Sequence, residues 1–298
     1  MVRRHTLGDG IVDALLYIVL TLLGLAALLP FVRVVAVSLS SAAAVLSGAV
    51  GLWPVHFYLG NYVRVLRDVP FYRALGVSVL RVGIGVLLTL GMTVITAYPL
   101  SLDDVRLPGR GTFKFLLLFA MLFHGGLIPT YLAYSSLGLL NSFWVLVLPG
   151  TLSIFFVILM SNFLRGIPRE LAEAATMDGA THVDILFRIY LPVSLPSLAT
   201  VTVFSALGHW NAWFDGLLYL KESFRWPLQT YAYQRIVSTG LQAKAGYLKD
   251  TTITDLSDIT PEGLRAALLV LATIPVLLVY PLLQRYFVTG LTLGAIKE

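Results

Sequence analysis

The residues of this chain that could perform catalysis do not form a catalytic or metal-binding arrangement. The five histidines show neither a His-Glu-x-x-His pattern nor another spacing typical of a metal site. No Gly-Lys pair occurs, so the chain has no G-x-x-x-x-G-K-[ST] loop for the phosphates of ATP. Asp103 and Asp104 could bind a metal ion in a membrane-bound glycosyltransferase, but a polar turn before Leu107 explains them better. We therefore expect no catalytic residue and no metal site. The histidines are His5, His56, His124, His182 and His209.

The segment 166–192 has a composition that favours contact with another protein over catalysis. Pro168 suits the first turn of a helix, and Glu173 would lie near the positive end of that helix dipole. Ala174 and Ala175 are strong helix formers, and Gly179 can stop the helix by adopting a left-handed conformation. Small side chains let a partner approach closely, and one carboxylate can then set the register. A connector lying on the membrane surface would need neither feature.

A second short helix is predicted directly after this turn. Thr181 and Asp184 form a weak capping-box pattern. Three apolar residues would give this helix one apolar face, and Pro192 would end it. The apolar residues are Val183, Leu186 and Phe187.

The composition of the 298 residues excludes an ordinary soluble protein. Hydrophobic residues make up 57% of the chain and charged residues 12%, whereas soluble proteins have roughly 25% charged residues. The net charge of +5 comes from Lys and Arg that flank apolar segments without forming a cationic stripe, so we expect contact with membrane lipid and none with nucleic acid. The fold predicted is all-α, a polytopic membrane protein.

Six stretches have the roughly 20 apolar residues that a membrane-spanning helix needs. An even number of spans places both termini on one side. Lys and Arg occur near the N-terminus and in the loops after the second and fourth spans, which places both termini in the cytoplasm. The two long loops, 33–74 and 215–263, would then lie outside although they also carry Lys and Arg, so they disagree with this rule. We expect one membrane domain over residues 1–298, with 239–263 as an outer loop. The predicted spans are Ile11–Val32, Leu75–Leu100, Thr112–Tyr134, Phe143–Leu164, Val193–Phe214 and Leu264–Phe287.

The predicted outer end of the fifth span combines aromatic and polar residues. On a helix, Trp210 and Trp213 would share one face, and Asn211 and Asp215 another. Rings stack on sugar faces while amide and carboxylate groups hydrogen-bond hydroxyls, so these residues could form one wall of a sugar path. They could equally anchor the chain at the lipid interface, where tryptophan is enriched.

The segment 166–192 resembles the EAA loop of permease subunits of ABC importers. The matching residues are Glu173-Ala-Ala-x-x-Asp178-Gly179-Ala180, followed by Phe187-Arg-Ile-x-Leu-Pro192-x-x-x-Pro196. Further motifs along nearly the whole chain resemble the carbohydrate branch of this family, which includes maltose-type and oligo- and polysaccharide permeases. Examples are Gly125-Gly-Leu-Ile-Pro129 and Gly208-His-Trp-Asn-Ala-Trp-Phe-Asp215.

The resemblance implies a type I importer permease in the cell inner membrane, with six spans and cytoplasmic termini. Glu173 would meet a basic residue of a separate ATPase, which would bind ATP and Mg²⁺. No cofactor is expected in this chain. The expected partners are a related permease, two ATPase subunits and an extracytoplasmic solute-binding protein. The residues implied to form the coupling contact are Glu173, Ala174, Ala175, Asp178, Gly179, Ala180, His182, Leu186 and Phe187.

Two alternative transport functions remain at this point. An ion-coupled secondary transporter would need ionisable residues inside the bilayer. Arg81 and Asp215 lie near predicted span ends, where a side chain can reach the interface, and no carboxylate relay is visible. The other alternative is an ABC permease for a solute that is not a sugar. If the solute is a carbohydrate, the resemblance includes acidic oligosaccharides such as alginate or pectin fragments among the expected substrates.

Overall fold

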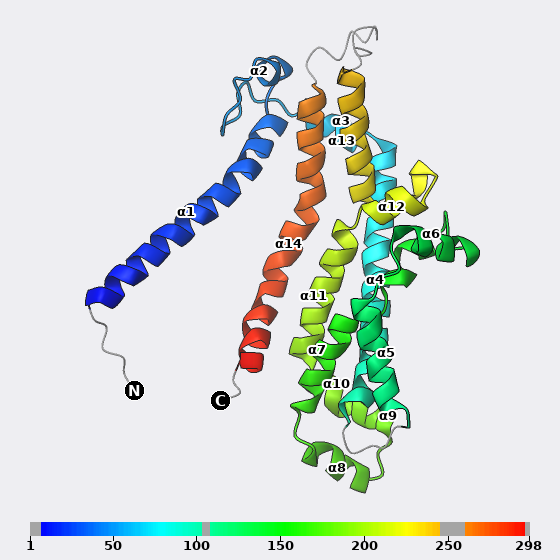
Figure 1. Ribbon diagram of the computed structural model, residues 1–298. Helices are drawn as coiled ribbons and strands as arrows, with labels where there is room; N and C mark the ends of the chain where they lie inside the picture. The colour runs from blue at the N-terminus through cyan, green and yellow to red at the C-terminus, as the bar shows by residue number, and fades with distance from the viewer. Residues whose placement is uncertain (1–6, 103–107, 245–259, 296–298) are drawn as a thin grey trace. The chain divides into compact units, whose positions relative to one another are not determined.

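The computed structural model describes residues 7–102, 108–244 and 260–295, and it consists of helices and connecting turns (Figure 1). In the described ranges, the β-structure recorded is one isolated bridge between Ser40 and Phe57. Two compact units can be distinguished: Met1–Val69 with Gln234–Ile274, and Pro70–Tyr233 with Pro275–Glu298. The all-α prediction is confirmed.

Three of the predicted spans are continuous helices long and apolar enough to cross a membrane. They are α1 (Leu7–Ser38), α4 (Val69–Ser101) and α14 (Pro261–Ala295). Each extends beyond the apolar run from which it was predicted. In the described residues, three bent helix pairs raise the number of possible spans to six.

The third predicted span is broken by a sharp turn. Helix α5 (Arg110–Leu122) and helix α6 (Leu127–Ser136) meet at 118°. Phe123 is extended, and Gly126 has φ +90° with ψ 175°, a conformation essentially restricted to glycine. Helix α5 is only about 20 Å long at 1.5 Å per residue, against roughly 30 Å of bilayer hydrocarbon. The span predicted over Thr112–Tyr134 is therefore two helices joined at a sharp turn and not one continuous helix.

The other two bent pairs have smaller angles. The 3-10 helices η1 (Phe143–Leu146) and η2 (Leu148–Gly150) precede α7 (Ile154–Arg165) with a bend of 44°. The helical stretch 182–193 meets α11 (Leu195–Asn211) at 79°. Within that stretch α9 (His182–Ile185), a π-helical turn η3 (Leu186–Tyr190) and α10 (Leu191–Val193) follow one another.

The unit formed by Met1–Val69 and Gln234–Ile274 is held by polar contacts between loop and helix residues. After α2 (Ala42–Leu46), helix α3 (Gly60–Leu66) contributes the buried Asn61, whose Nδ2 donates to the Ser38 carbonyl at 3.0 Å. Tyr62 Oη and Ser38 Oγ are 2.7 Å apart, and Arg235 pairs with Asp68 at 2.8 Å. The contacts of Ser38 connect the end of α1 to α3, and the ion pair connects α13 to the residues that follow α3.

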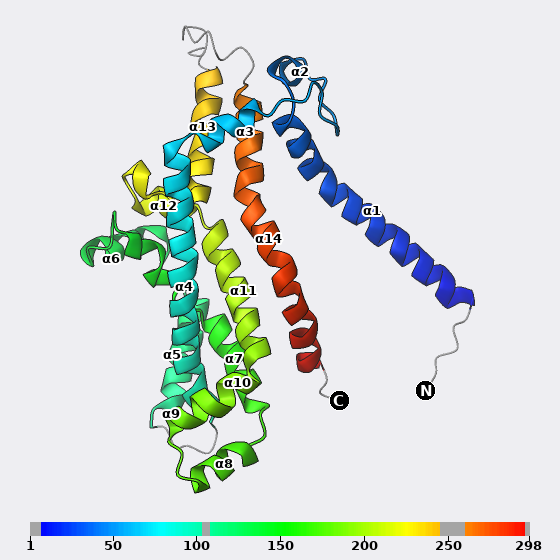
Figure 2. The same cartoon turned by 180° about the vertical axis from the view of Figure 1, so that it is seen from behind.

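The second unit has its largest core where α4, α7 and α11 run alongside one another (Figure 2). Ala97 from α4, Met160 from α7 and Val201 from α11 have no exposed surface. Ile185 and Tyr190 from the stretch 182–193 belong to the same core. The packing therefore joins the segment 166–192 directly to the long helices.

The segment after α11 contains α12 (Phe214–Tyr219), the 3-10 turn η4 (Ser223–Arg225) and α13 (Leu228–Lys244). Helix α13 and the start of α14 occupy both ends of the predicted outer loop 239–263, so the loop prediction is wrong at those ends. Residues 245–259 lie outside the described residues, as do Asp103 and Asp104. The predicted single domain over 1–298 stays a prediction.

Candidate functional site

The turn predicted at Gly179 is present between two short helices. Asp178 is the C-cap residue of helix α8 (Glu170–Met177), and Gly179 after it has φ +82°. The Ala180 N–H donates to the Ala175 carbonyl at 2.9 Å, and the Gly179 N–H donates to Thr176 at 3.0 Å. These two bonds form a Schellman motif, which satisfies carbonyls at the helix end. Pro168 lies before α8 and not in its first turn, in contrast to the prediction.

The second helix starts at the predicted capping box. The Thr181 Oγ1 accepts the Asp184 N–H at 3.2 Å, and the Asp184 carboxylate accepts the Thr181 N–H at 3.2 Å. The side-chain hydrogen bond from Thr181, the backbone bond and Arg188 lower the pKa of Asp184 below its ordinary value of 3.8. The helical stretch then passes Pro192 by one residue and ends at Val193. The widened turn over 186–190 accommodates the missing N–H of this proline.

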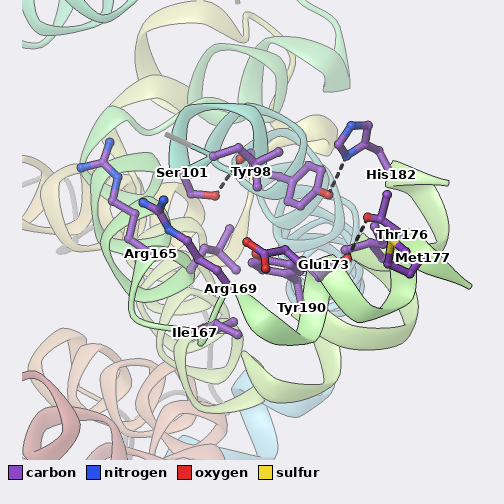
Figure 3. Close-up of a pocket in the computed structure, with 14 residues that line it drawn as sticks. Tyr98, Ser101, Arg165, Ile167, Arg169, Glu173, Thr176, Met177, His182 and Tyr190 are labelled. Carbon is purple, nitrogen blue, oxygen red and sulfur yellow. Dashed lines mark hydrogen bonds between the residues drawn. The ribbon is translucent and has the colours of Figure 1, made fainter. Parts of the chain in front are cut away.

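A pocket of about 560 Å³ separates α8 from the cytoplasm-facing ends predicted for α4 and α7. Figure 3 shows Glu173 pointing into this pocket alongside Arg169 and Tyr98. Arg165 and His182 also contribute to the lining. The carboxylate of Glu173 thus faces a space bounded by cationic and aromatic side chains, and the residue is exposed.

A second link connects the segment 166–192 to α4. Tyr98 Oη and His182 Nδ1 form a hydrogen bond of 3.3 Å. The Tyr98 ring also meets the Tyr190 ring edge-on, with centroids 5.4 Å apart. His182 therefore contacts the end of a long helix as well as lying on the exposed side of the turn.

The predicted coupling residues lie on two sides of the segment 166–192. One side packs against the hydrophobic core, and the other side is exposed. Leu186 is 8% exposed and belongs to the core, and Ala175 and Ala180 pack against the same core. Phe187 is 62% exposed, while Ala174 and Asp178 also lie on the surface. The prediction treated Leu186 and Phe187 alike, but adjacent residues on a helix point in different directions.

Two exposed apolar residues of this segment, Leu171 and Met177, were missed from the sequence, and Met177 is 89% exposed. Val183, which was predicted to lie on the apolar face of the second helix, is exposed as well. Met177 occupies a variable position inside the Glu173-Ala-Ala-x-x-Asp178 pattern, so the motif did not draw attention to it. The sequence could have indicated them as exposed contact residues, because apolar side chains occur on both of the successive short helices.

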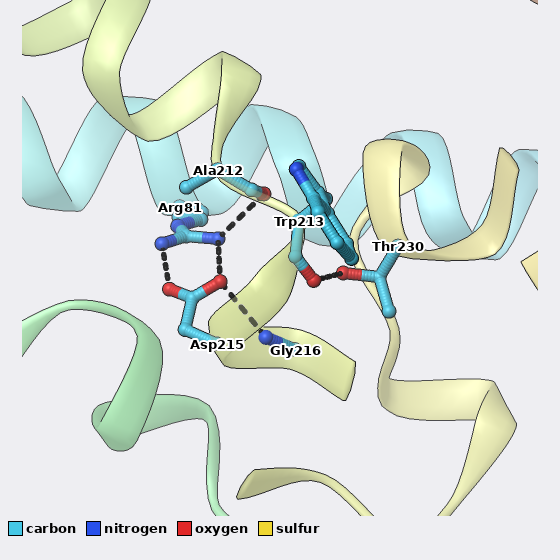
Figure 4. Close-up of polar contacts among 6 residues, drawn as sticks. All are labelled: Arg81, Ala212, Trp213, Asp215, Gly216 and Thr230. Atoms are coloured by element: carbon cyan, nitrogen blue, oxygen red, sulfur yellow. Dashed lines mark hydrogen bonds and ion pairs between the residues drawn. The ribbon is translucent and has the colours of Figure 1, made fainter. Parts of the chain in front are cut away.

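A buried ion pair lies in the first half of α4, away from Tyr98 near its other end. Arg81 is 3% exposed, and both of its Nη atoms bond the carboxylate of Asp215 (Figure 4). Its Nη1 also donates to the Ala212 carbonyl at 3.2 Å. That carbonyl lies where α11 has ended and Ala212 is extended, so Arg81 supplies a partner to backbone released by the break. The expectation that Arg81 reaches toward the interface is wrong.

The same face of α4 makes further close contacts with α11 and with the segment after it. Ser78 Oγ accepts the Leu228 N–H at 2.7 Å. Within that segment, Thr230 Oγ1 donates to the Trp213 carbonyl at 2.7 Å. A Cβ placed on Gly85 would lie 2.5 Å from Nε2 of His209. Glycine at this position therefore allows α4 and the His209 ring to approach.

The four predicted path residues do not form the two helical strips expected of them. Helix α11 ends at Asn211, so residues 210–215 are not one helix. Trp210 is 7% exposed, whereas Asn211 lies on the surface. Trp213 stacks on Tyr233 at a centroid distance of 4.1 Å, and Asp215 is paired with Arg81. The geometry leaves Asn211 and Trp213 as the accessible members of the set.

Long apolar helices joined to an exposed helix–turn–helix are typical of a membrane protein with a structured loop between spans. The chain belongs to the family described as binding-protein-dependent transport system inner membrane component, whose model matches residues 2–293. It is therefore a permease of an ABC importer. This membership decides against the ion-coupled alternative.

Individual relatives agree with this membership. The chain is 39% identical to the polygalacturonan/rhamnogalacturonan transport system permease protein YtcP of Bacillus subtilis (strain 168), over 96% of this chain and 98% of the relative. An arabinooligosaccharides transport system permease protein AraQ of Halalkalibacterium halodurans is 27% identical over 82% and 81%. A chain of a bacterial ABC transporter involved in import of the acidic polysaccharide alginate has a TM-score of 0.85 at 34% identity, covering 95% and 99%.

Proposed function

We propose that this chain imports an acidic oligosaccharide as one of two related permeases, with a separate ATPase docked on the segment 166–192 and a solute-binding protein on the outer side. The observation that carries the docking proposal is the exposure of four apolar residues in this segment, Leu171, Met177, Val183 and Phe187. ATP and Mg²⁺ would bind to the ATPase, with no cofactor and no catalytic residue in this chain.

Glu173 would provide the charged contact of this interface. Its carboxylate faces the pocket next to α8, where a basic side chain of the ATPase can reach it (Figure 3). Movement of α8 would then act on α4 through the bond between His182 and Tyr98 and through the shared core. Because α4 is continuous from Tyr98 to Arg81, the displacement can reach the outer end of the pathway as rigid-body motion.

The Glu173→Lys variant tests the docking proposal. Truncating one partner of a desolvated charge pair costs about 2–5 kcal/mol, and a lysine adds repulsion. The ATPase should dissociate during purification, or hydrolyse ATP without transport, while the permease still inserts. Glu170→Lys is the matched control, since it makes the same charge change in the same helix. Equal ATPase retention and transport in both variants would contradict the assignment.

The acidic substrate class is supported by the relatives of higher identity. The two relatives whose printed names refer to polygalacturonan/rhamnogalacturonan or to alginate are 39% and 34% identical, against 27% for the arabinooligosaccharide permease. A binding assay of the cognate solute-binding protein with oligogalacturonates and uncharged oligosaccharides tests this class. Preference for the uncharged series would reject it, and a non-sugar ligand would favour the remaining alternative.

Asn211 and Trp213 are the residues we propose for the sugar path. Replacing each with alanine should change the transport ratio between a preferred and a poor sugar several-fold, because one lost hydrogen bond or stacking contact is worth about 1–3 kcal/mol. Trp210→Ala is a buried aromatic control from the same segment. An equal reduction for both sugars in every variant would assign these residues a structural role.

A further inference from the structure

A run of exposed apolar side chains extends from the end of α2 to the start of α3. Trp53 is 81% exposed, Leu46 74% and Phe57 66%. Leu52 and Leu59 are exposed as well. Large apolar side chains gathered on an exposed surface commonly mark a contact with another protein or with a membrane. We refer to residues 46–59 as the 46–59 segment.

Backbone hydrogen bonds hold the 46–59 segment against the end of α1. The Ser41 N–H donates to the carbonyls of Val55 and His56, at 3.3 and 3.1 Å. The Tyr58 N–H donates to the Leu39 carbonyl at 2.8 Å. His56 has a φ of 51°, which is uncommon for a residue other than glycine. The segment therefore folds back as a defined loop and lies beside the end of α1 (Figure 1).

The charges of α1 indicate the depth of this end in the bilayer. No Asp, Glu, Lys or Arg lies between Asp13 and Arg33. Arg33 follows Asp13 by 20 residues, or roughly 30 Å at 1.5 Å per residue, which equals the thickness of the hydrocarbon core. The helix continues for five residues beyond Arg33, about 8 Å, and so ends in the headgroup layer. The 46–59 segment, which is bonded to this end, lies at the same depth.

The composition of this region favours lipid over a soluble protein as the molecule that covers it. No Asp, Glu, Lys or Arg occurs from residue 34 to residue 63. A soluble partner that binds and dissociates would leave these side chains in water, and the interfaces of such complexes are only about as apolar as an ordinary protein surface. Tryptophan, in contrast, is enriched at the boundary between membrane and water, where its ring is apolar and its N–H is polar.

We propose that the 46–59 segment is an interfacial anchor, which inserts Trp53 and Phe57 into the headgroup–acyl boundary of the leaflet opposite the N-terminus. Interfacial segments bury their apolar side chains about 5–10 Å into this boundary. From Val12 to Arg33 the side chains of α1 are exposed, so packing within this chain does not set the depth of the helix. The anchor sets that depth, because it is hydrogen-bonded to the end of α1. This contact depends on neither the sugar nor the ATPase.

Spin labels on single cysteines test the proposal, since the chain has no cysteine of its own. The full importer, with cysteine-free partner subunits, is placed in nanodiscs of phosphatidylglycerol and phosphatidylethanolamine. Labels at Leu52→Cys and Phe57→Cys should be more accessible to oxygen, which dissolves in lipid, than to a water-soluble nickel chelate. Leu52→Cys leaves both aromatic side chains in place. Glu262→Cys, at an exposed charged position of α14, is the control and should show the reverse order.

The contribution of Trp53 is measured in the Leu52→Cys background. Trp53→Asp should reduce the preference of the label for oxygen, because a carboxylate is expelled from the apolar side of the boundary. Trp53→Phe is the matched variant and should preserve the preference. Equal accessibility profiles in the two variants would contradict the anchoring role of this ring.

The other molecules that could cover the segment give different accessibility profiles. Higher accessibility to the nickel chelate at both Leu52→Cys and Phe57→Cys would place the segment in water and overturn the proposal. If that accessibility fell when the solute-binding protein was added, the surface would belong to this soluble partner instead. Low accessibility to both reagents would assign the segment to the sister permease and would equally reject the lipid contact.

Discussion

Arg81 and Asp215 are 134 residues apart in the chain, yet their side chains form an ion pair between α4 and the region where α11 gives way to α12. Gly216 also donates its N–H to Asp215 Oδ1 at 2.8 Å, which orients the carboxylate toward the guanidinium. The pair thereby fixes a broken helix against a continuous one. The position of the outer end of the fifth span against α4 therefore depends on a single buried cation, Arg81.

Asp215→Ala should destabilise the protein by about 3 kcal/mol, because it leaves Arg81 buried without its counter-ion. Thermal unfolding of the purified protein measures the effect. Glu222→Ala is the matched control: its partner Arg225 lies at 2.9 Å, but both side chains are about 40% exposed, so the loss should stay below about 1 kcal/mol. Replacing both Arg81 and Asp215 with apolar residues should recover much of the stability. Similar losses of stability in the two alanine variants would show that the buried ion pair stabilises the protein no more than the exposed pair does.

Gly85→Ala should destabilise the packing of α4 by about 1–3 kcal/mol, because the new methyl group would overlap the buried His209 ring. Gly83→Ala tests the same substitution in the same helix where no atom lies within 4 Å. There the gain in helix propensity should stabilise by up to about 1 kcal/mol. Opposite shifts of the unfolding temperature are expected, and shifts of the same sign would contradict the close approach.

Gly179→Ala should cost about 1 kcal/mol locally, because alanine is strained at φ +82°. Transport should fall more than membrane expression does, since a displaced α9 alters the docking face. Gly179→Asn should be milder, because asparagine tolerates the left-handed region. Expression and transport are measured in parallel for both variants. Full transport in Gly179→Ala would show that this turn can relax without loss of function.

Asp184 should stabilise the start of α9 in a pH-dependent way. Its pKa is lowered in the folded state, so its contribution is fully present above the ordinary value of 3.8 and is lost as the pH falls through the lower folded value. Titration of the ¹³C-labelled carboxyl group by NMR measures this pKa. Thr181→Ala removes the largest cause and should raise the pKa toward 3.8. An unchanged pKa in that variant would assign the shift to another group.

The features recognisable from the sequence depend on interactions between neighbours in the chain. Apolar runs predict long helices because crossing a bilayer requires an uninterrupted apolar stretch. Gly179, Thr181 and Asp184 specify a turn and a cap through bonds to residues three to five positions away. The family pattern around Glu173 is equally local. These predictions could be made without knowledge of the tertiary structure.

The directions of helices and side chains were decided by the tertiary structure. A hydropathy window averages over the bend at Gly126 because apolar residues continue on both sides of it. Trp213 and Asp215 do not continue the faces expected for them because α11 ends at Asn211, which no periodicity could show. The sequence by itself determined a membrane permease with a local turn at Gly179. Only long-range packing could pair Arg81 with Asp215, because the energy of that contact depends on two segments meeting in space and leaves no local pattern in either.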